Sequence, residues 1–321
     1  GIGTLFKGTK LLRIGLAGAA IAAASFALEA NKLQRDLGLS LQQTSKILAQ
    51  SKAVAAVNKA NGMTQEDTLA IIKNISTEFG SFSAATTSAT LQASNLVANF
   101  GLATDSVGTL ARQMQAVGAD SLESALNSIE LQANMARAAD VPVGDVMNDV
   151  AKNTEFFARF AKNGGANVTA AAIAARKLGL EMSNVASIAD SLLDFENSIT
   201  KQMEAEVLLG RELNLEKARE LVFNNDIAGA MAEISNLVSP EEFNQMDAIR
   251  RRALAESVGL QADQLSRAIS AGGAQGGITT NMRTGGAVAA QGGTDKMDTL
   301  IMAVNEGNAT LAREIQRQGV N

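Results

Sequence analysis

A short pattern recurs along this chain and limits what it can fold into: a glycine, then an apolar residue, then a helix-capping residue a few positions on. It occurs at Gly38-Leu39-Ser40, Gly62-Met63-Thr64, Gly101-Leu102-Ala103-Thr104, Gly179-Leu180-Glu181-Met182-Ser183 and Gly259-Leu260-Gln261-Ala262-Asp263. Glycine suits the left-handed conformation that ends a helix, and Ser, Thr or Asp suits the start of the next one. The pattern predicts consecutive short helices joined by tight turns. Its spacing is irregular and does not indicate a regular solenoid.

Between these turns, apolar residues recur at intervals of three and four, the period of an amphipathic helix. One such stripe is Leu122, Leu126, Ile129 and Ala133, and another is Val185, Ile188, Leu192 and Phe195. The two prolines, Pro142 and Pro240, stand where helices are expected to begin. Strand-like alternation is missing, so the predicted fold is all-α, with an apolar N-terminal helix and a coiled-coil-like C-terminal helix.

The hydrophobic residues predict a thin core. They make up 46% of the chain, but only 3% of the residues are aromatic, all of them Phe, and much of the rest is Ala. Small side chains bury little area each, so we expect a core that is sparse or shared with other chains. Phe156, Phe157 and Phe160 are expected to form its densest part.

The residue types argue against an enzyme. The chain has no Cys and no His, which excludes thiolate and imidazole chemistry. Its acidic residues, from Asp190 and Asp194 through Glu220, are spaced for solvated helix faces. We therefore expect no catalytic residue, cofactor or metal. The net charge of −5 argues against nucleic-acid binding, and Arg250-Arg251-Arg252 is expected late in a helix, opposite its negative end.

Composition divides the chain into four zones. Residues 1–30 are basic and then apolar, residues 31–270 form a helical body, residues 271–294 are a Gly-rich linker, and residues 295–321 form a last helix. Because the first residue is Gly, we expect a processed chain or part of a longer one.

The N-terminal zone carries an uncharged stretch, residues 14–28. As a helix it would rise about 22 Å, short of a hydrocarbon core of about 30 Å. This stretch has three possible interpretations: a helix buried in an oligomer, a conditional membrane segment, or a signal peptide. The apolar residues that would enter the membrane are Ile14, Leu16, Ile21, Phe26 and Leu28.

The last zone has the 3.5-residue period of a coiled coil. The seam consists of Met297, Ile301, Val304, Asn308, Leu311, Ile315 and Gln318. We expect it to associate with itself, as a trimer or within a hexamer, and Asn308 would set the register. Docking of this helix in a groove of another protein is the alternative.

Three phrases within residues 140–270 resemble phage tail tape measure proteins, which set the length of the tail. The phrases are residues 156–167 (FFARFAKNGGAN), residues 172–196 (AIAARKLGL, leading to VASIADSLLDFE) and residues 204–219 (EAEVLLGRELNLEKAR), with EFNQM at residues 242–246 further on. None of these phrases is a catalytic signature. The resemblance covers under half of the chain.

The resemblance implies a virion protein that lies inside the tail tube and binds the tube proteins and the tail tip or baseplate hub. It implies three or six copies, assembly in the host cytoplasm, and ejection at infection to help DNA cross the host envelope, with contact to the inner membrane. A continuous helix of this length would be about 480 Å long, and the many glycine turns predict a compact helical end instead.

Two other functions compete with this interpretation. A secreted pore-forming or translocator protein of a bacterial export system would use the N-terminal stretch as a membrane hairpin, although only one such stretch is present. A peptidoglycan-cutting enzyme would need a carboxylate motif, which we do not find.

Overall fold

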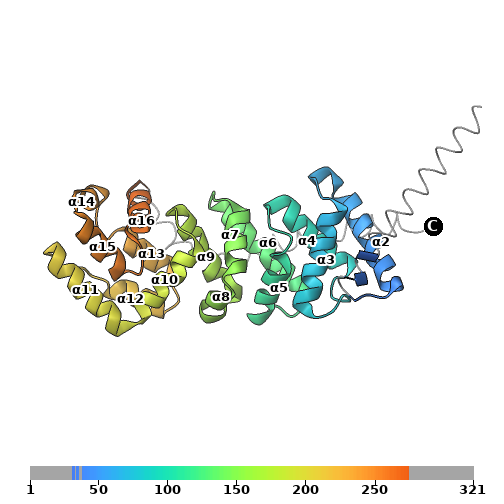
Figure 1. Cartoon of the computed structure of the whole chain (residues 1–321), viewed down its shortest axis with the longest axis horizontal. Helices are drawn as coiled ribbons and strands as arrows, with labels where there is room; N and C mark the ends of the chain where they lie inside the picture. The colour runs from blue at the N-terminus through green and yellow to red at the C-terminus, as the bar shows by residue number, and fades with distance from the viewer. Residues whose placement is uncertain (1–30, 33, 36–37, 275–321) are drawn as a thin grey trace, which may run out of the picture. The chain divides into compact units, whose positions relative to one another are not determined.

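The computed structural model describes residues 31–32, 34–35 and 38–274, and these residues fold entirely into helices and turns (Figure 1). No strand occurs among them, so the predicted all-α class is confirmed. Residues 1–30 and 275–321 lie outside the described residues. They include the predicted membrane-segment residues and the predicted coiled-coil seam.

The described chain divides into two compact units. Unit 1 holds the described residues up to Lys177, together with Glu181–Ala186 and Asn224–Ala228. Unit 2 holds Leu178–Leu180, Ser187–Phe223 and the described residues from Gly229 onward. Each unit is treated by itself below.

Unit 1 is built from short helices that pack on their near neighbours in the sequence. Its elements are α2 (Leu41–Val57), η1 (Lys59–Asn61), α3 (Gln65–Phe79), α4 (Thr87–Phe100), α5 (Val107–Ala116), α6 (Leu122–Ala138), α7 (Val143–Lys152), α8 (Thr154–Phe160), η2 (Asn163–Gly165) and α9 (Ala166–Lys177). Helices two apart in the order contact one another: α2 with α4, α3 with α5, α4 with α6, α5 with α7 and α7 with α9. Figure 1 shows these helices following one another in chain order.

The second half of the described chain is also made of short helices. Its elements are α10 (Met182–Leu193), α11 (Phe195–Leu209), α12 (Glu216–Phe223), α13 (Ile227–Ser235), α14 (Pro240–Gln245), α15 (Ala248–Ser257) and α16 (Ala262–Ala274). Within unit 2, α15 packs against both α11 and α16, and α14 packs against α16. Gly259 lets the turn after α15 approach α10 closely, because a Cβ there would lie 2.6 Å from the Ser187 carbonyl oxygen.

All five glycines of the recurrent pattern have positive φ angles, from 64° to 82°. The apolar residue after each of them is buried, and these residues are Leu39, Met63, Leu102, Leu180 and Leu260. Ser40 and Thr64 then cap α2 and α3 through their hydroxyl groups. In both cases the third helical residue accepts a hydrogen bond from the backbone of the capping residue.

The other three capping residues were predicted wrongly. Thr104 stands two residues before Ser106, the residue at the N-cap of α5, while Ser183 and Asp263 lie inside α10 and α16, which begin at Met182 and Ala262. At the start of two of these helices, the third helical residue accepts from the backbone of the residue before the helix. The backbone N–H of Glu181 donates to the Asn184 side chain, and that of Gln261 donates to the Gln264 side chain.

The core of unit 1 follows the predicted stripe. Leu122, Leu126, Ile129 and Ala133 are all buried along α6. Phe156, Phe157 and Phe160 are also buried, and the rings of Phe156 and Phe160 lie 4.5 Å apart between centroids. The aromatic cluster is therefore part of the core, as predicted.

Two expectations about the second half of the described chain are wrong. The stripe from Val185 does not extend to Phe195, because α10 ends at Leu193 and the Asp194 side chain caps a new helix, α11. The arginine run lies in the first half of α15 and not late in a helix. The helix dipole therefore does not stabilise it.

Each arginine of this run has an acceptor close by in the chain. Arg250 pairs with Asp247, Arg252 pairs with Glu256 at 2.6 Å, and Arg251 donates to the backbone carbonyls of Phe243 and Asn244. The hydrogen bond and charge of Glu256 raise the pKa of the Arg252 guanidinium. These local contacts agree with a structural role for the run.

Candidate interaction surface

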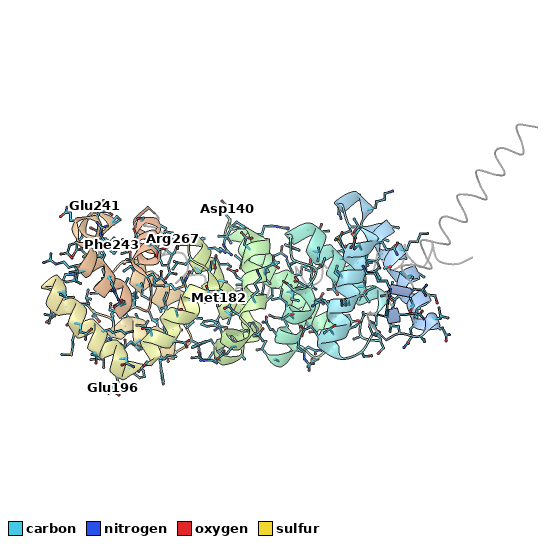
Figure 2. All side chains as sticks on the ribbon, viewed as in Figure 1. Asp140, Met182, Glu196, Glu241, Phe243 and Arg267 are labelled. Carbon is cyan, nitrogen blue, oxygen red and sulfur yellow. The ribbon has the colours of Figure 1, made fainter. Side chains whose placement is uncertain are left out.

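The outer face of α11 carries a row of uncovered apolar side chains. Phe195, Ile199, Met203 and Val207 are 48%, 48%, 60% and 82% exposed, and we call this row the α11 ridge. Residues four apart lie on one face of a helix, so the ridge is continuous over about 18 Å. Figure 2 labels Glu196, the residue after Phe195, near the start of α11.

The inner face of α11 is made of small and polar side chains. Ser198 and Ala205 are its buried residues, and α11 packs on α15. A surface helix ordinarily turns its large apolar side chains toward the core and its polar ones toward water. In α11 this arrangement is reversed. A contiguous row of exposed apolar side chains is typical of surfaces that bind another apolar surface.

Arg219 of α12 fixes this orientation. Its guanidinium is buried, with 8% of the residue exposed, and donates from Nε to the Ser198 hydroxyl at 2.9 Å and from Nη2 to Gln202 Oε1 at 2.6 Å. Gln202 donates in turn to Glu206 Oε1 at 2.7 Å. Glu206 Oε1 also accepts from the backbone N–H of Leu213 at 2.9 Å. The inner face is thereby tied to α12 and to the turn that precedes it.

Two pKa values in this network are shifted. Burial lowers the pKa of the Arg219 guanidinium, and the charges of Glu216 and Glu206 partly offset that effect. The hydrogen bond from Gln202, then that from Leu213, lower the pKa of Glu206, while burial opposes them and the charge of Arg219 assists. Glu206 is therefore held as a carboxylate, and its role here is to accept hydrogen bonds.

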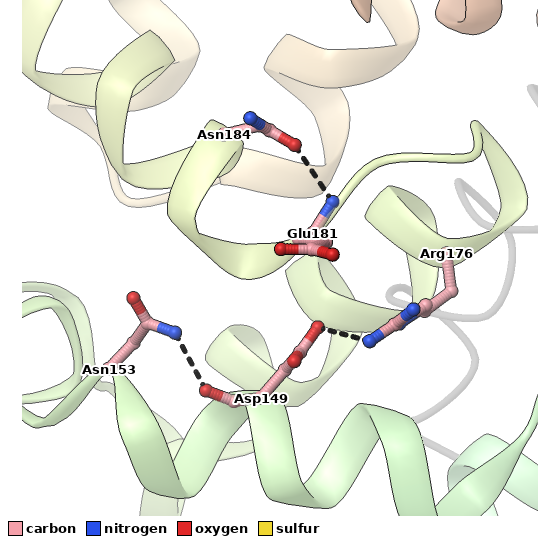
Figure 3. Close-up of polar contacts among 5 residues, drawn as sticks. All are labelled: Asp149, Asn153, Arg176, Glu181 and Asn184. Atoms are coloured by element: carbon pink, nitrogen blue, oxygen red, sulfur yellow. Dashed lines mark hydrogen bonds and ion pairs between the residues drawn. The ribbon is translucent and has the colours of Figure 1, made fainter.

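Several buried and half-buried polar contacts serve the packing of unit 1. Arg176 on α9 pairs with Asp149 on α7 at 2.7 Å, and Asn153 donates to the Asp149 backbone carbonyl at 2.8 Å (Figure 3). Gln132 on α6 accepts from Thr169 on α9 at 2.6 Å and donates to the Gly164 carbonyl at 2.8 Å. The Asn153 contact closes the end of α7, and the others join α7 to α9 and α6 to α9 and its preceding turn, so all of them have structural partners.

The predicted acidic faces do not gather into a site. Over the described residues, no group of three or more acidic residues could hold a metal ion. Asp194 caps α11 and Glu206 serves the Arg219 network, so these two carboxylates have structural partners.

The sequence interpretation missed the α11 ridge, although its signal was present. Residues 190–206 were assigned to an acidic, solvated face, and the four apolar residues at intervals of four run through the same helix. The predicted seam from Met297 to Ile315 and the predicted membrane residues from Ile14 to Leu28 lie outside the described residues and stay predictions. Within the described part of the chain, no helix combines the length and apolar character needed to cross a membrane.

Comparison of the chain with family models, curated proteins and solved structures finds no match.

Proposed function

We propose that this chain is a structural, protein-binding component of a tailed phage particle, the compact helical end of a tape measure protein. In this role it sets tail length with the rest of its chain and binds the tail tip or baseplate hub inside the tube. It acts in few copies, three or six. At infection it leaves the tube and assists the passage of DNA across the host envelope.

The observation that carries the proposal is the α11 ridge. A helix that turns Ile199, Met203 and Val207 outward and seats Ser198 inward is suited to binding another protein. The ridge lies inside residues 140–270, the part of the sequence that resembles tape measure proteins. The resemblance and the uncovered apolar face support the same kind of function.

The packing of unit 1 gives further support. Its helices contact near neighbours in the chain, and many of its buried side chains are Ala, including Ala89, Ala93 and Ala125. A core of this kind stabilises a short-range helical array and leaves room for contributions from partners. Such an array suits a protein that works by presenting surface to an assembly.

The experiment that tests the proposal is a peptide map and copy number of this protein in purified phage particles. Three or six copies per tailed particle are the expected result. Recovery of the protein only as a free chain outside any particle would overturn the proposal. Leakage of liposomes caused by that free chain would then favour the pore-forming alternative.

A further inference from the structure

We propose that the C-terminal segment of the same chain, residues 297–318, docks its apolar seam on the α11 ridge. The inference goes beyond the proposed function and does not depend on it. It joins two apolar surfaces, the α11 ridge on unit 2 and the predicted seam in the sequence after α16.

The first step is the ridge itself. Four large apolar side chains on one helix face stay in contact with water in unit 2, and Val207 is 82% exposed. Removing such surface from water is favourable in proportion to its area. The polar contacts of Arg219 prevent α11 from rotating the ridge inward, because rotation would break the hydrogen bonds to Ser198 and Gln202.

The second step is where the described chain ends. It ends at Ala274 in α16, and α15 packs against both α16 and α11, so one helix separates the end of the chain from the ridge helix. Packed helices lie about 8–10 Å apart between axes, which places α16 and α11 within about 20 Å of each other. Residues 275–296 are 22 residues long, and a Gly-rich linker of that length has a mean reach of about 25 Å.

The third step is the match between the two apolar rows. As a helix, the seam from Ile301 to Ile315 would be about 21 Å long, close to the length of the ridge. The seam alternates steps of three and four, and the ridge steps by four. A seam with alternating steps of three and four is the kind that packs lengthwise against a neighbouring helix, at a crossing angle of about 20°. The tether also gives the segment an effective concentration of about a millimolar at the ridge, which no separate partner has at ordinary protein concentrations.

Docking within one chain has a consequence for assembly. The seam that would cover the ridge is the same seam that is predicted to form trimers or hexamers. A docked seam cannot associate with other copies, so the chain stays monomeric until a partner displaces the segment. The contact would then hold both apolar surfaces covered before assembly.

The test uses the absence of Cys from the chain. Val207→Cys places one thiol on the ridge, and Glu204→Cys places one beside it without altering an apolar residue. Each is made in the full chain and in a chain that also carries Ile301→Asp and Leu311→Asp, and the rate of thiol alkylation is measured. Val57→Cys, on the exposed side of α2 in unit 1, is the matched control.

The expected result is about tenfold slower alkylation of both α11 thiols when the seam is intact, as for a docked population of about 90%. The rate should not depend on protein concentration, and Val57→Cys should react equally in both backgrounds. Equal rates at α11 with and without the two aspartates would overturn the proposal. Protection that grows with protein concentration would also overturn it and would assign the ridge to a second copy.

Discussion

Arg219 on α12 donates from Nε to the hydroxyl oxygen of Ser198 on α11 at 2.9 Å, and this contact decides which face of α11 is turned inward. The same guanidinium reaches Gln202 one turn further along α11. A buried cation that donates to polar side chains fixes a helix in rotation, because any other rotation leaves the charge without acceptors. The exposed apolar ridge follows from this inner polar row.

Arg219→Ala should destabilise unit 2 by about 2–3 kcal/mol, because Ser198 and Gln202 would lose their buried donor. Urea unfolding monitored by hydrogen exchange in α11 and α12 measures the loss. The matched control is Arg252→Ala, whose side chain is 77% exposed and pairs with Glu256. That change should cost much less, because an exposed ion pair contributes little to stability. An equal cost for both would show that the Arg219 contacts do not stabilise unit 2.

Stability should depend on pH through Glu206. Its pKa in the folded chain is lowered from the ordinary 4.5, so the ionised form favours folding. The stabilisation should be fully present above about pH 4.5 and should be lost as the pH falls through the lowered pKa. Wild type should therefore be more stable than Glu206→Gln at neutral pH, and the difference should shrink in acid. Unfolding curves at several pH values test this.

The control for that series is Glu204→Gln, which removes one charge from an exposed position of the same helix. If Glu204→Gln reproduces the acid dependence, the effect belongs to the net charge of α11 and not to the hydrogen bonds of Glu206.

Gly259→Ala should destabilise unit 2 by about 2–4 kcal/mol. The residue has φ of +74°, and a Cβ would lie 2.6 Å from both the Ser187 carbonyl oxygen and Ser191 Cβ. Gly210→Ala is the matched control, because Gly210 has φ of +69° with open space around it and should cost only about 1–2 kcal/mol. Thermal unfolding of the two variants separates the clash from the backbone strain. Equal losses would contradict the close approach of the Gly259 turn to α10.

Gln132→Leu should destabilise unit 1 by about 1–3 kcal/mol, because the Thr169 hydroxyl would lose its acceptor and the Gly164 carbonyl its donor. Adding Thr169→Val should recover part of the loss, since an apolar pair leaves no unpaired hydroxyl. A double-mutant cycle measured by urea unfolding gives the coupling. Additive effects would argue against the contact, and Gln42→Leu, on the exposed side of α2, should be near neutral.

The sequence predicted the features that local chemistry controls. The helical class, the buried stripe on α6 and the caps at Ser40 and Thr64 depend on residues within one or two turns of one another. The break between α10 and α11 was missed because it has no Gly or Pro, and Asp194 ends one helix and caps the next without either.

The arrangement of α11 could not be predicted from its own residues. The apolar row from Phe195 to Val207 and the polar row with Ser198 and Gln202 both have helical spacing. The residues of α11 alone therefore do not determine which row faces the core. Arg219 decides this, and it stands 21 residues after Ser198, in another helix. The position of a buried cation is set by tertiary packing, so the exposed ridge was visible only once the partners of Arg219 were known.

The packing order of unit 1 has a consequence for how the chain forms. Helices whose main contacts are with their first, second and third neighbours bring together residues that are close in sequence, so little chain entropy is lost before each contact forms. Folds of this kind form rapidly, and their early helices can pack while later ones are still being synthesised. The N-terminal part of unit 1 could therefore be assembled before α11 and its uncovered apolar row leave the ribosome.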